Sequence, residues 1–493
     1  MKEIEIKEIL LKGECVTLEC KRAKSEVPKS VWETYSAFAN TIGGVILLGI
    51  EENKKESDKQ KRFQIIGVDD AQKIVNDFWN TINSDKVNEN ILGSGDVDTV
   101  EINGVQIVCI NVPQADWRMK PIYLNGNVYK GTYRRNHEGD YHCTERQVRA
   151  MIRDSFEEGN DSMLLEHYDM NDIDLDTLHR YRTLFQFRND GHVWNGVDDK
   201  TFLKNLGGYI IDRATGKEGL TMAGLMMFGK GLSVQERFAN FRMDYIDFCN
   251  LIGDERYSDR LTYDGRWENN LYQFFSRVIP KVTADFPRPF RMEGIQRVDD
   301  TPQHKAVREA FTNAIIHSDL LMDAGILRVE KHDDRLCFRN PGLLRLPIEQ
   351  IFEGGVSYAR NPKIQNMLRM VGYGENLGSG FPLILDAWKQ AGWDTPVLNN
   401  KLELDMVELV LPLSNKRTID ASDTINDGLN DGLNENIIAT YTIIRSNPGI
   451  QRKDISDISG KSIPTIERHL AILIKEDLIE HRGPKKTGGY YAK

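Results

Sequence analysis

One helix, predicted over residues 303–317, constrains this chain more than any other stretch. Its apolar residues recur at steps of three and four, so they form one stripe that must be buried against a neighbouring layer; they are Ala306, Val307, Ala310, Phe311, Ala314 and Ile315. Glu309 and Asn313 are four residues apart and share a neighbouring face. Such a pair can hold a metal–nucleotide complex, or it can be a surface pair that adds a few tenths of a kcal/mol to the helix.

Length and charge limit the possible architectures. A chain of 493 residues is expected to form about three domains, each with its own core. The N-terminus carries acidic residues where a signal peptide needs a basic start, and no apolar run is long enough to span a bilayer. The sequence therefore predicts a cytoplasmic protein with no membrane partner. Its six cysteines form no C-x-x-C pair, so neither a disulfide framework nor a structural zinc is indicated.

The first domain is predicted over residues 1–158. A strand at 16–21 would place Glu19 and Lys21 on one face, and a buried strand at 45–50 leads directly into Glu51 and Glu52. The stretch resembles the Schlafen-type AlbA domain, an α/β domain, over roughly residues 10–150. The residues that carry the resemblance are Ser36-Ala-Phe-Ala-Asn-Thr-Ile-Gly-Gly44, Glu14-x4-Glu19-Cys-Lys21 and Leu47-Leu-Gly-Ile-Glu-Glu52.

This resemblance implies a possible catalytic site. Some members of that family are metal-dependent ribonucleases with three acidic residues, which would here be Glu14, Glu19 and Glu52. Carboxylate oxygens suit Mg²⁺ or Mn²⁺, which could activate water at a phosphodiester, while Lys21 could stabilise charge on the phosphate. The third position holds Glu where the nucleolytic members carry Asp. The alternative is that these acids lie at the rim of a module that binds nucleic acid, RNA included, or that forms oligomers.

Residues 159–295 are predicted to form a mixed α/β middle domain without chemistry of its own. Gly224-x4-Gly229-Lys230 matches the first part of a phosphate-binding P-loop. The next residue is Gly231, so the hydroxyl that would ligate magnesium is missing, and the intervening Leu-Met-Met-Phe is typical of a core. We therefore predict a packed segment here and no phosphate site.

The surroundings of the 303–317 helix favour a nucleotide site. Two strands follow it, 326–331 and 335–339, then Asn340-Pro-Gly342, and then a glycine-rich segment, Gly372–Phe381, before an apolar helix. A glycine-rich loop that opens into a helix presents free N–H groups to an anion. This order resembles a divergent GHKL-type ATPase, the α/β sandwich of gyrase and histidine kinases, in the version found in RecG-related proteins of the transcriptional-regulator type. The match spans about 300–410, within a domain predicted over 296–413.

The GHKL resemblance implies ATP and Mg²⁺ (or Mn²⁺) as cofactors and assigns roles to particular residues. Glu309 would be the water-activating base and Asn313 a metal ligand. Asn340 stands where the family usually has an Asp that contacts adenine, which predicts binding with weaker discrimination. The remaining ATP-binding candidates belong to the two loops and are Gly342, Gly378, Ser379 and Gly380. A sensor of ATP or a weak ATPase is expected, and a fold with an empty pocket is the alternative.

The C-terminal part is predicted to be a separate module. Residues 414–434 form a flexible linker, because the tandem repeat Asp427-Gly-Leu-Asn-Asp-Gly-Leu-Asn434 has no core-forming period. Residues 435–493 carry ten Lys/Arg and seven Asp/Glu, a net charge of +3 in a chain with a net charge of −10. They resemble a winged helix-turn-helix that binds duplex DNA, although some winged helices bind proteins instead. The resemblance places Ser462, Thr465, Arg468 and His469 at the major groove and Lys485 and Lys486 on phosphates.

The sequence thus predicts a multidomain α/β (α+β) protein and leaves three functions open. In the first, nucleotide state shifts the affinity of a DNA-binding transcriptional regulator. In the second, a metal-dependent nuclease acts through the N-terminal acids on RNA or DNA, in defence against foreign nucleic acid. In the third, the chain is a scaffold that forms homo-oligomers and has lost both chemistries.

Overall fold

The computed structural model describes most of the chain, in these ranges: 3–12, 15–53, 62–156, 158–251, 253–288, 292–293, 296–297, 300–374, 380–413, 437, 440–441, 443–444, 449–459, 463–475, 478–482 and 489–492. Two compact units make up the chain, Met1–Ser414 and Asn415–Lys493. The predicted linker, 414–434, lies outside these ranges. Among the helices within them, none is both long and apolar enough to cross a membrane.

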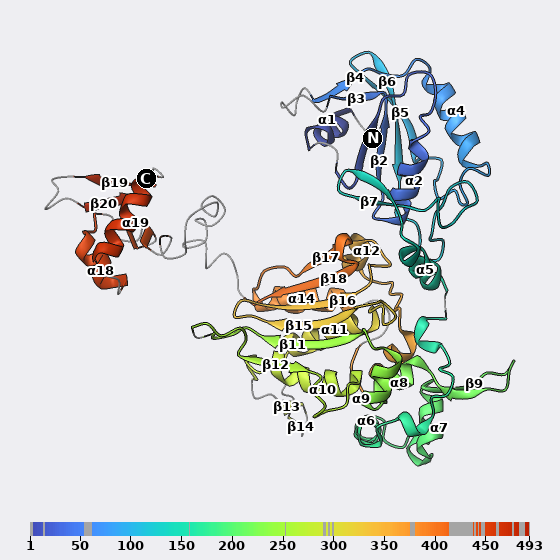
Figure 1. Ribbon diagram of the computed structural model, residues 1–493, viewed down its shortest axis with the longest axis vertical. Coiled ribbons are helices and arrows are strands. Elements are labelled where there is room, and N and C mark those ends of the chain that lie inside the picture. Colours follow the sequence, from blue (N-terminus) through green and yellow to red (C-terminus); the bar gives the residue numbers. More distant parts are fainter. Residues whose placement is uncertain are drawn as a thin grey trace. The chain divides into compact units, whose positions relative to one another are not determined.

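The N-terminal part of the first unit is built on a four-stranded sheet (Figure 1). Its order is β1 (Leu18–Lys21), β2 (Gly44–Leu48), β6 (Val105–Val112) and β5 (Val97–Ile102), and only the β1–β2 pair is parallel. Helices α2 (Val31–Asn40) and α4 (Ala71–Ile82) pack on one face, and α1 (Glu3–Lys12) packs on the other through Ile6 and Leu10. A hairpin of β7 (Tyr133–Asn136) and β8 (Gly139–His142) precedes α5 (Glu145–Asp154).

The strand predicted over 45–50 is interrupted by a glycine. Gly49 has φ of +97°, a conformation that glycine adopts without steric cost. The chain therefore turns after β2, and the next strand, β3 (Ile50–Glu52), pairs with β4 (Phe63–Ile65) instead of extending the main sheet. As a result Glu52 lies on a separate two-stranded ribbon, while Glu19 lies in the four-stranded sheet.

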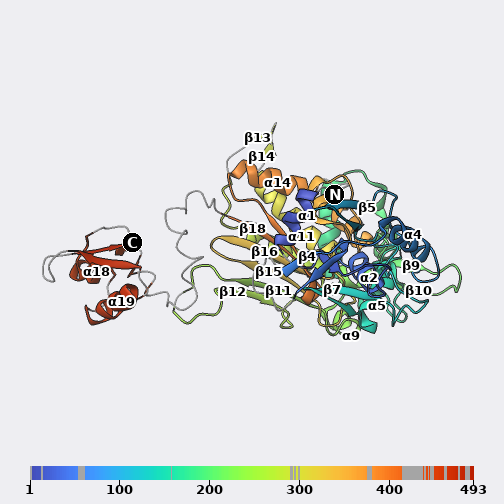
Figure 2. The ribbon, with the colours of Figure 1, turned by 90° about the horizontal axis from the view of Figure 1, so that it is seen from above.

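A six-stranded sheet organises the rest of the first unit. Its order is β12 (Asp259–Thr262), β11 (Arg242–Asp247), β15 (Ile326–Lys331), β16 (Arg335–Pro341), β18 (Met406–Pro412) and β17 (Val397–Lys401). Figure 2 shows the strands following one another across this sheet. Strands β11 and β15 pair in parallel, so the predicted middle domain contributes two strands to the predicted GHKL-like domain. The predicted boundary at 295/296 falls between strands that belong to one continuous sheet.

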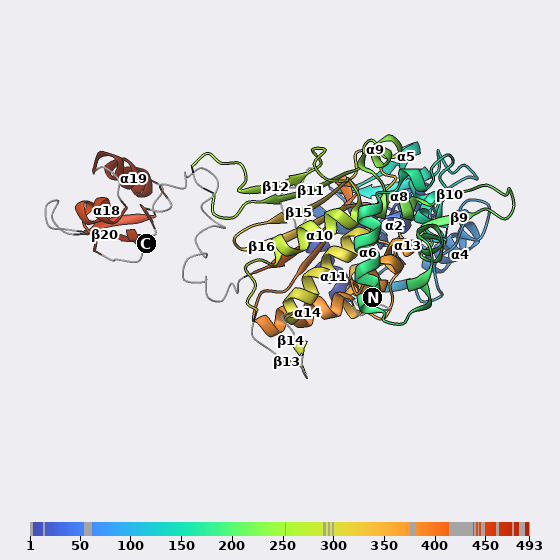
Figure 3. The ribbon, with the colours of Figure 1, turned by 90° about the horizontal axis from the view of Figure 1, so that it is seen from below.

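Three helices lie side by side over one face of this sheet: α10 (Leu271–Val282), α11 (Pro302–Ile316) and α14 (Gly380–Ala391) (Figure 3). Helix α11 is the one predicted over 303–317. It begins after Thr301, whose side chain accepts a hydrogen bond from the His304 N–H, and Pro302 occupies its first turn. All six residues of the predicted apolar stripe are buried, which confirms that the stripe faces the core.

The remaining elements of the first unit are shorter, and several of them join the same core. They are α6 (Leu175–Arg188), α7 (Asp199–Asn205), β9 (Tyr209–Ile211), β10 (Glu218–Leu220), α8 (Met222–Phe228), α9 (Gly231–Arg237), β13 (Met292–Glu293), β14 (Gln296–Arg297), α12 (Ile348–Glu353) and α13 (Pro362–Met370). Every residue of α8 is buried, and a Cβ on Gly224 would lie 2.0 Å from the Gly208 carbonyl oxygen. The P-loop-like segment is thus a packed helix, as predicted.

The second unit contains α18 (Arg452–Ser459), α19 (Ile463–Lys475) and an antiparallel hairpin of β19 (Ile479–Arg482) and β20 (Gly489–Ala492). Its core is largely aliphatic and includes Ile455, Ile466, Leu470, Leu473 and Ile479. This order of helix, helix and hairpin is the one expected of a winged helix-turn-helix.

Candidate functional site

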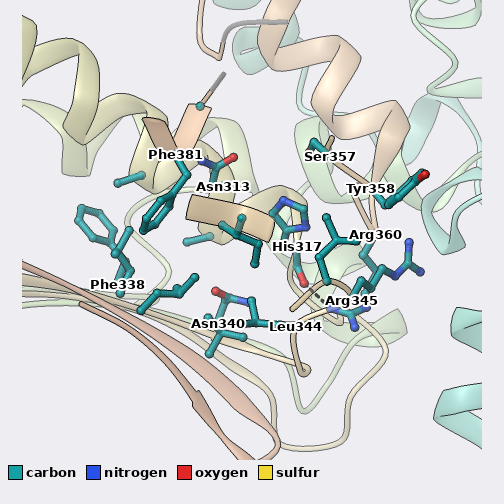
Figure 4. Close-up of a pocket in the computed structure, with 18 of the residues that line it drawn as sticks. Asn313, His317, Phe338, Asn340, Leu344, Arg345, Ser357, Tyr358, Arg360 and Phe381 are labelled. Atoms are coloured by element: carbon teal, nitrogen blue, oxygen red, sulfur yellow. Dashed lines mark hydrogen bonds between the residues drawn. The ribbon is translucent and has the colours of Figure 1, made fainter. Parts of the chain in front are cut away.

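A pocket lies between helices α11 and α14 and the six-stranded sheet (Figure 4). Four of the predicted ATP-binding residues line it: Glu309, Asn313, Asn340 and Gly380. They come from three elements, α11, β16 and α14. The two that are farthest apart in sequence, Glu309 and Gly380, are separated by 71 residues. Gly342 lines the neighbouring cavity, and Gly378 and Ser379 lie outside the described residues.

Glu309 and Asn313 face the interior of the protein. Glu309 is only 7% exposed, and Asn313 Nδ2 donates a hydrogen bond to Glu309 Oε1 at 3.3 Å. A Cβ on Gly380 would lie 2.1 Å from Glu309 Oε1 and 3.3 Å from Asn313 Nδ2. Glycine at this position therefore lets the start of α14, the positive end of its dipole, approach the carboxylate. The alternative of a solvated surface pair is wrong.

Asn340 lies at the sheet side of the pocket. It is 4% exposed, and its Nδ2 reaches the Pro341 carbonyl oxygen at 3.5 Å, which is a weak contact. Around it the lining is largely apolar, with Phe338, Phe381 and Leu409. A mostly apolar wall with a few convergent polar groups is typical of a small-molecule site. A carboxamide here can exchange hydrogen bonds with the edge of a heterocyclic base without adding charge.

The opposite end of the pocket is basic, which the sequence did not reveal. Arg345 and Arg360 line it together with His317, the residue that follows α11. Burial, and then the charges of Arg360 and Arg345, lower the pKa of His317 to about 3, so this imidazole is neutral near pH 7. His317 could have been suspected from its place at the end of the helix. No local pattern marks the two arginines.

Both arginines bind a carboxylate from the N-terminal part, and we call Asp154, Arg345 and Arg360 the Asp154 cluster. Arg360 Nη2 lies 2.9 Å from Asp154 Oδ2, and Arg345 Nη2 lies 3.6 Å from Asp154 Oδ1. Arg360 also donates to the carbonyl oxygens of His317 and Leu343. Burial alone would raise the pKa of Asp154, but Arg360, Arg345 and Arg153 outweigh it and lower the pKa. The last residue of α5 is thereby fixed to the wall of the pocket.

The predicted nuclease residues are engaged by basic side chains. Glu19 lies 2.8 Å from Lys21 Nζ and 2.8 Å from Arg135 Nη2. On the β3–β4 ribbon, Glu52 accepts a hydrogen bond from Arg62 Nε at 2.6 Å. Glu14 lies outside the described residues, so the three-acid metal site stays a prediction.

Arg135, which the sequence did not single out, forms an ion pair with Glu19. Its side chain is fully buried over the Phe38 ring, with the guanidinium carbon 5.1 Å from the ring centroid. It donates to Asp140 Oδ1 at 2.9 Å and to the carbonyl oxygens of Cys15 and Leu18 at 3.1 and 3.0 Å. Glu19 and Asp140 therefore both help to neutralise a buried cation.

Within the described ranges, Glu330, His332 and Cys337 bring three potential metal ligands within 4.8 Å of one another. The residues present do not suit a metal ion. Glu330 Oε1 already lies 2.8 Å from Arg339 Nη1, and burial raises the pKa of the Cys337 thiol, which disfavours the thiolate that a metal requires.

In the second unit, Arg468 is exposed and Thr465 is partly exposed on α19, as a groove-facing helix requires. His469 is a correction: it is only 7% exposed, and its Nδ1 lies 2.7 Å from Thr440 Oγ1. Its position explains this, because it is three residues after Ile466 and four before Leu473, and both belong to the core. Ser462, Lys485 and Lys486 lie outside the described residues.

The fold and pocket define a class: a multidomain α+β protein with an AlbA-type N-terminal domain, an ATPase-like domain and a C-terminal winged helix. Comparison with protein families confirms the three resemblances. Residues 14–144 match the family described as "Schlafen, AlbA_2", residues 326–409 match "Putative ATP-dependent DNA helicase recG C-terminal", and residues 433–480 match "Winged helix-turn-helix DNA-binding". Residues 149–244 match a domain of unknown function, DUF8451. Together these matches support nucleic-acid binding.

Solved structures similar to the chain include the following two. The DIP2311 protein from Corynebacterium diphtheriae is 14% identical, with 99% of each chain covered and a TM-score of 0.39. The N-terminal domain of a RecG-related protein from Nitrosomonas europaea is 25% identical, covering 29% of this chain and 94% of that one, with a TM-score of 0.23. No curated protein matched the chain.

Proposed function

We propose that this protein is a DNA-binding transcriptional regulator whose ATPase-like domain senses ATP. The observation that carries the proposal is the convergence of Glu309, Asn313, Asn340 and Gly380 on one pocket. The carboxylate and the carboxamide of α11 offer hard oxygen ligands, so they fit Mg²⁺ or Mn²⁺ and would hold it beside the phosphates. When bound, the metal would neutralise phosphate charge. Asn340 would contact the base, and the buried Glu309 would orient water.

The nucleotide part predicts a thermal shift. A ligand that binds only the folded state at 100 times its Kd adds about 2.7 kcal/mol to stability. We therefore expect millimolar ATP with Mg²⁺ to raise the Tm of the wild-type chain. Asn340→Leu should lose most of this shift, because it keeps the branched shape of the side chain but removes the hydrogen-bonding amide. The readout is differential scanning fluorimetry, with calorimetric titration in parallel.

Asn366→Leu is the matched control for this experiment. Asn366 lies on α13 and does not line the pocket, so its variant should keep the full shift. If ATP leaves the wild-type Tm unchanged and calorimetry shows no heat of binding, the pocket does not sense ATP. If ATP does raise the Tm, Glu309→Gln distinguishes a sensor of ATP from a weak ATPase. A sensor should keep its thermal shift in this variant, whereas a weak ATPase should lose phosphate release.

The DNA part predicts a salt-dependent contact at Arg468. Its side chain is exposed on α19, the helix expected to enter the major groove. If Arg468 contacts a phosphate, Arg468→Ala should reduce the slope of log Kd against log salt by about one. Fluorescence anisotropy with duplex DNA over a series of salt concentrations measures both the affinity and the slope.

Arg22→Ala removes the same charge from an exposed site in the first unit and should leave the DNA affinity unchanged. Deletion of residues 435–493 should abolish salt-dependent binding. Binding that survives this deletion at full strength would assign the nucleic-acid affinity to the AlbA-type domain instead.

A further inference from the structure

A second cavity, of about 210 Å³, lies between the N-terminal part and the loop that follows β16. It shares Leu343, Leu344, Arg345 and Arg360 with the nucleotide pocket, but its other wall comes from the N-terminal part. On that side it is lined by Trp117, Lys120 and residues of α5. Of the predicted nuclease residues that the structure describes, Glu19, Lys21 and Glu52 do not line it.

Several residues that line the cavity carry hydrogen-bond donors without acceptors. Among the described residues, Trp117 Nε1, Arg153 Nε and Arg345 Nε are buried and have no hydrogen-bond partner. Lys120 offers three N–H groups, and the acceptor found for it in the described structure is the Asn40 carbonyl oxygen at 3.1 Å. Buried donors without acceptors are rare in native proteins and call for a bound partner. A partner that satisfies these donors would supply several acceptor oxygens.

The charge of the lining residues also favours an anionic ligand. Six cationic residues line the cavity, against four aspartates. Three of the carboxylates form ion pairs with arginines: Asp405 with Arg134, Asp319 with Arg153, and Asp154 with Arg345 and Arg360. Asp323 binds Asn240 through its side chain. Within the described ranges this leaves Lys120 and Arg146 without a carboxylate partner.

The excess of positive charge around the cavity affects the pKa of Lys120. Although part of the residue remains accessible, burial of its ammonium, and then the charge of Arg134, lower its pKa to about 7. Asp116, Asp154 and the Cys143 thiol act in the opposite direction but do not compensate. An anion in the cavity would restore the missing favourable charge.

We propose that this cavity binds a small phosphorylated molecule, with its phosphate against Lys120 and against the Trp117 and Arg345 N–H groups. Arg345 stacks on Trp117, with its guanidinium carbon 4.2 Å from the ring centroid, so both donors are held in place before the ligand arrives. A volume of about 210 Å³ suits a small molecule, whereas a nucleic-acid strand needs a long groove. An anion at Lys120 is expected whether or not the neighbouring pocket, which shares Arg345 and Arg360, binds ATP.

The full-length chain with sulfate as a probe tests this proposal. Sulfate is a dianion that does not titrate near neutral pH, so its pH dependence reports on the protein. Low millimolar sulfate should raise the Tm relative to chloride at equal ionic strength. Lys120→Met should lose this shift and keep its response to Mg-ATP, which separates the two sites. Trp117→Phe, which keeps an aromatic ring but removes the N–H, should bind sulfate more weakly than wild type.

Lys217→Met, at an exposed lysine, controls for the general stabilising effect of sulfate and should behave as wild type. Because the pKa of Lys120 is about 7, its charged fraction falls about tenfold from pH 6 to pH 8, and sulfate affinity should fall with it. Glycerol 3-phosphate should bind at least as tightly as sulfate at pH 7.

Two outcomes would overturn the proposal. If Lys120→Met and wild type show equal sulfate shifts, the unpaired donors are satisfied by water alone. If sulfate binds in a Lys120-dependent way and glycerol 3-phosphate does not, the cavity takes an adventitious ion only.

Discussion

Asp154→Asn should lower the free energy of unfolding of the first unit by about 3–5 kcal/mol, because it leaves two buried guanidinium groups without a counter-charge. The side chains of Arg360 and Arg345 are only 5% and 6% exposed. Asn has nearly the volume of Asp, so the loss reports the charge and not a cavity. The measurement is the shift in urea midpoint, multiplied by the m-value shared by both proteins.

The control lies on the same helix. Glu145 and Arg149 form an exposed pair at the start of α5, with side chains 71% and 69% exposed and 3.2 Å between their charged atoms. Glu145→Gln should cost less than about 0.5 kcal/mol, since exposed pairs contribute little. An Asp154→Asn variant that unfolds at the same midpoint as Glu145→Gln would contradict the assignment of the Asp154 cluster as the attachment of α5 to the pocket wall.

The second large effect is expected from Arg135→Leu in the AlbA-type domain. This change keeps an apolar contact with Phe38 but removes the charge that neutralises Glu19 and Asp140. Because its side chain is fully buried and bound at four oxygens, we expect a loss of about 3–5 kcal/mol. The urea midpoint of the same unit measures it. Arg22→Leu, which removes an exposed arginine paired with Glu51, should change stability by less than about 1 kcal/mol.

Arg135 also affects how a nuclease test must be interpreted. Removing the charge of Glu19 leaves Arg135 partly uncompensated, so Glu19→Gln should weaken the domain whether or not Glu19 binds a metal. Loss of RNA or DNA cleavage in this variant would support catalysis only if its unfolding midpoint stays near that of wild type. Cleavage with Mn²⁺ that persists in Glu19→Gln would exclude the metal-dependent nuclease.

Features that depend on local spacing could be predicted from the sequence. The apolar stripe of α11 is one, and the packed residues of α8 are another, because both follow from the period of a helix. The pairing of Glu309 with Asn313 follows from the same period. Its burial against Gly380 could be inferred only from the resemblance to a known fold.

Features that depend on distant partners could not be predicted. Asp154 lies 206 residues before Arg360, and no local pattern links a charge at the end of one helix to a loop in another part of the chain. The position of β11 beside β15 was missed for the same reason, since a parallel pair forms only after a long crossover. His469 is predicted at the DNA groove because it is polar. Its helical spacing relative to Ile466 and Leu473 places it in the core instead.

The parallel pairing of β11 with β15 also determines how the ATPase-like domain can be isolated. A fragment that starts at residue 296 would lack β11, so the backbone N–H and C=O groups along one side of β15 would have no partner. The exposed edge would carry Leu327 and Val329, both fully buried in the intact protein. An uncovered apolar edge strand recruits strands from other molecules. Such a fragment should aggregate, whereas one that retains β11 and β12 keeps the native edge of the sheet.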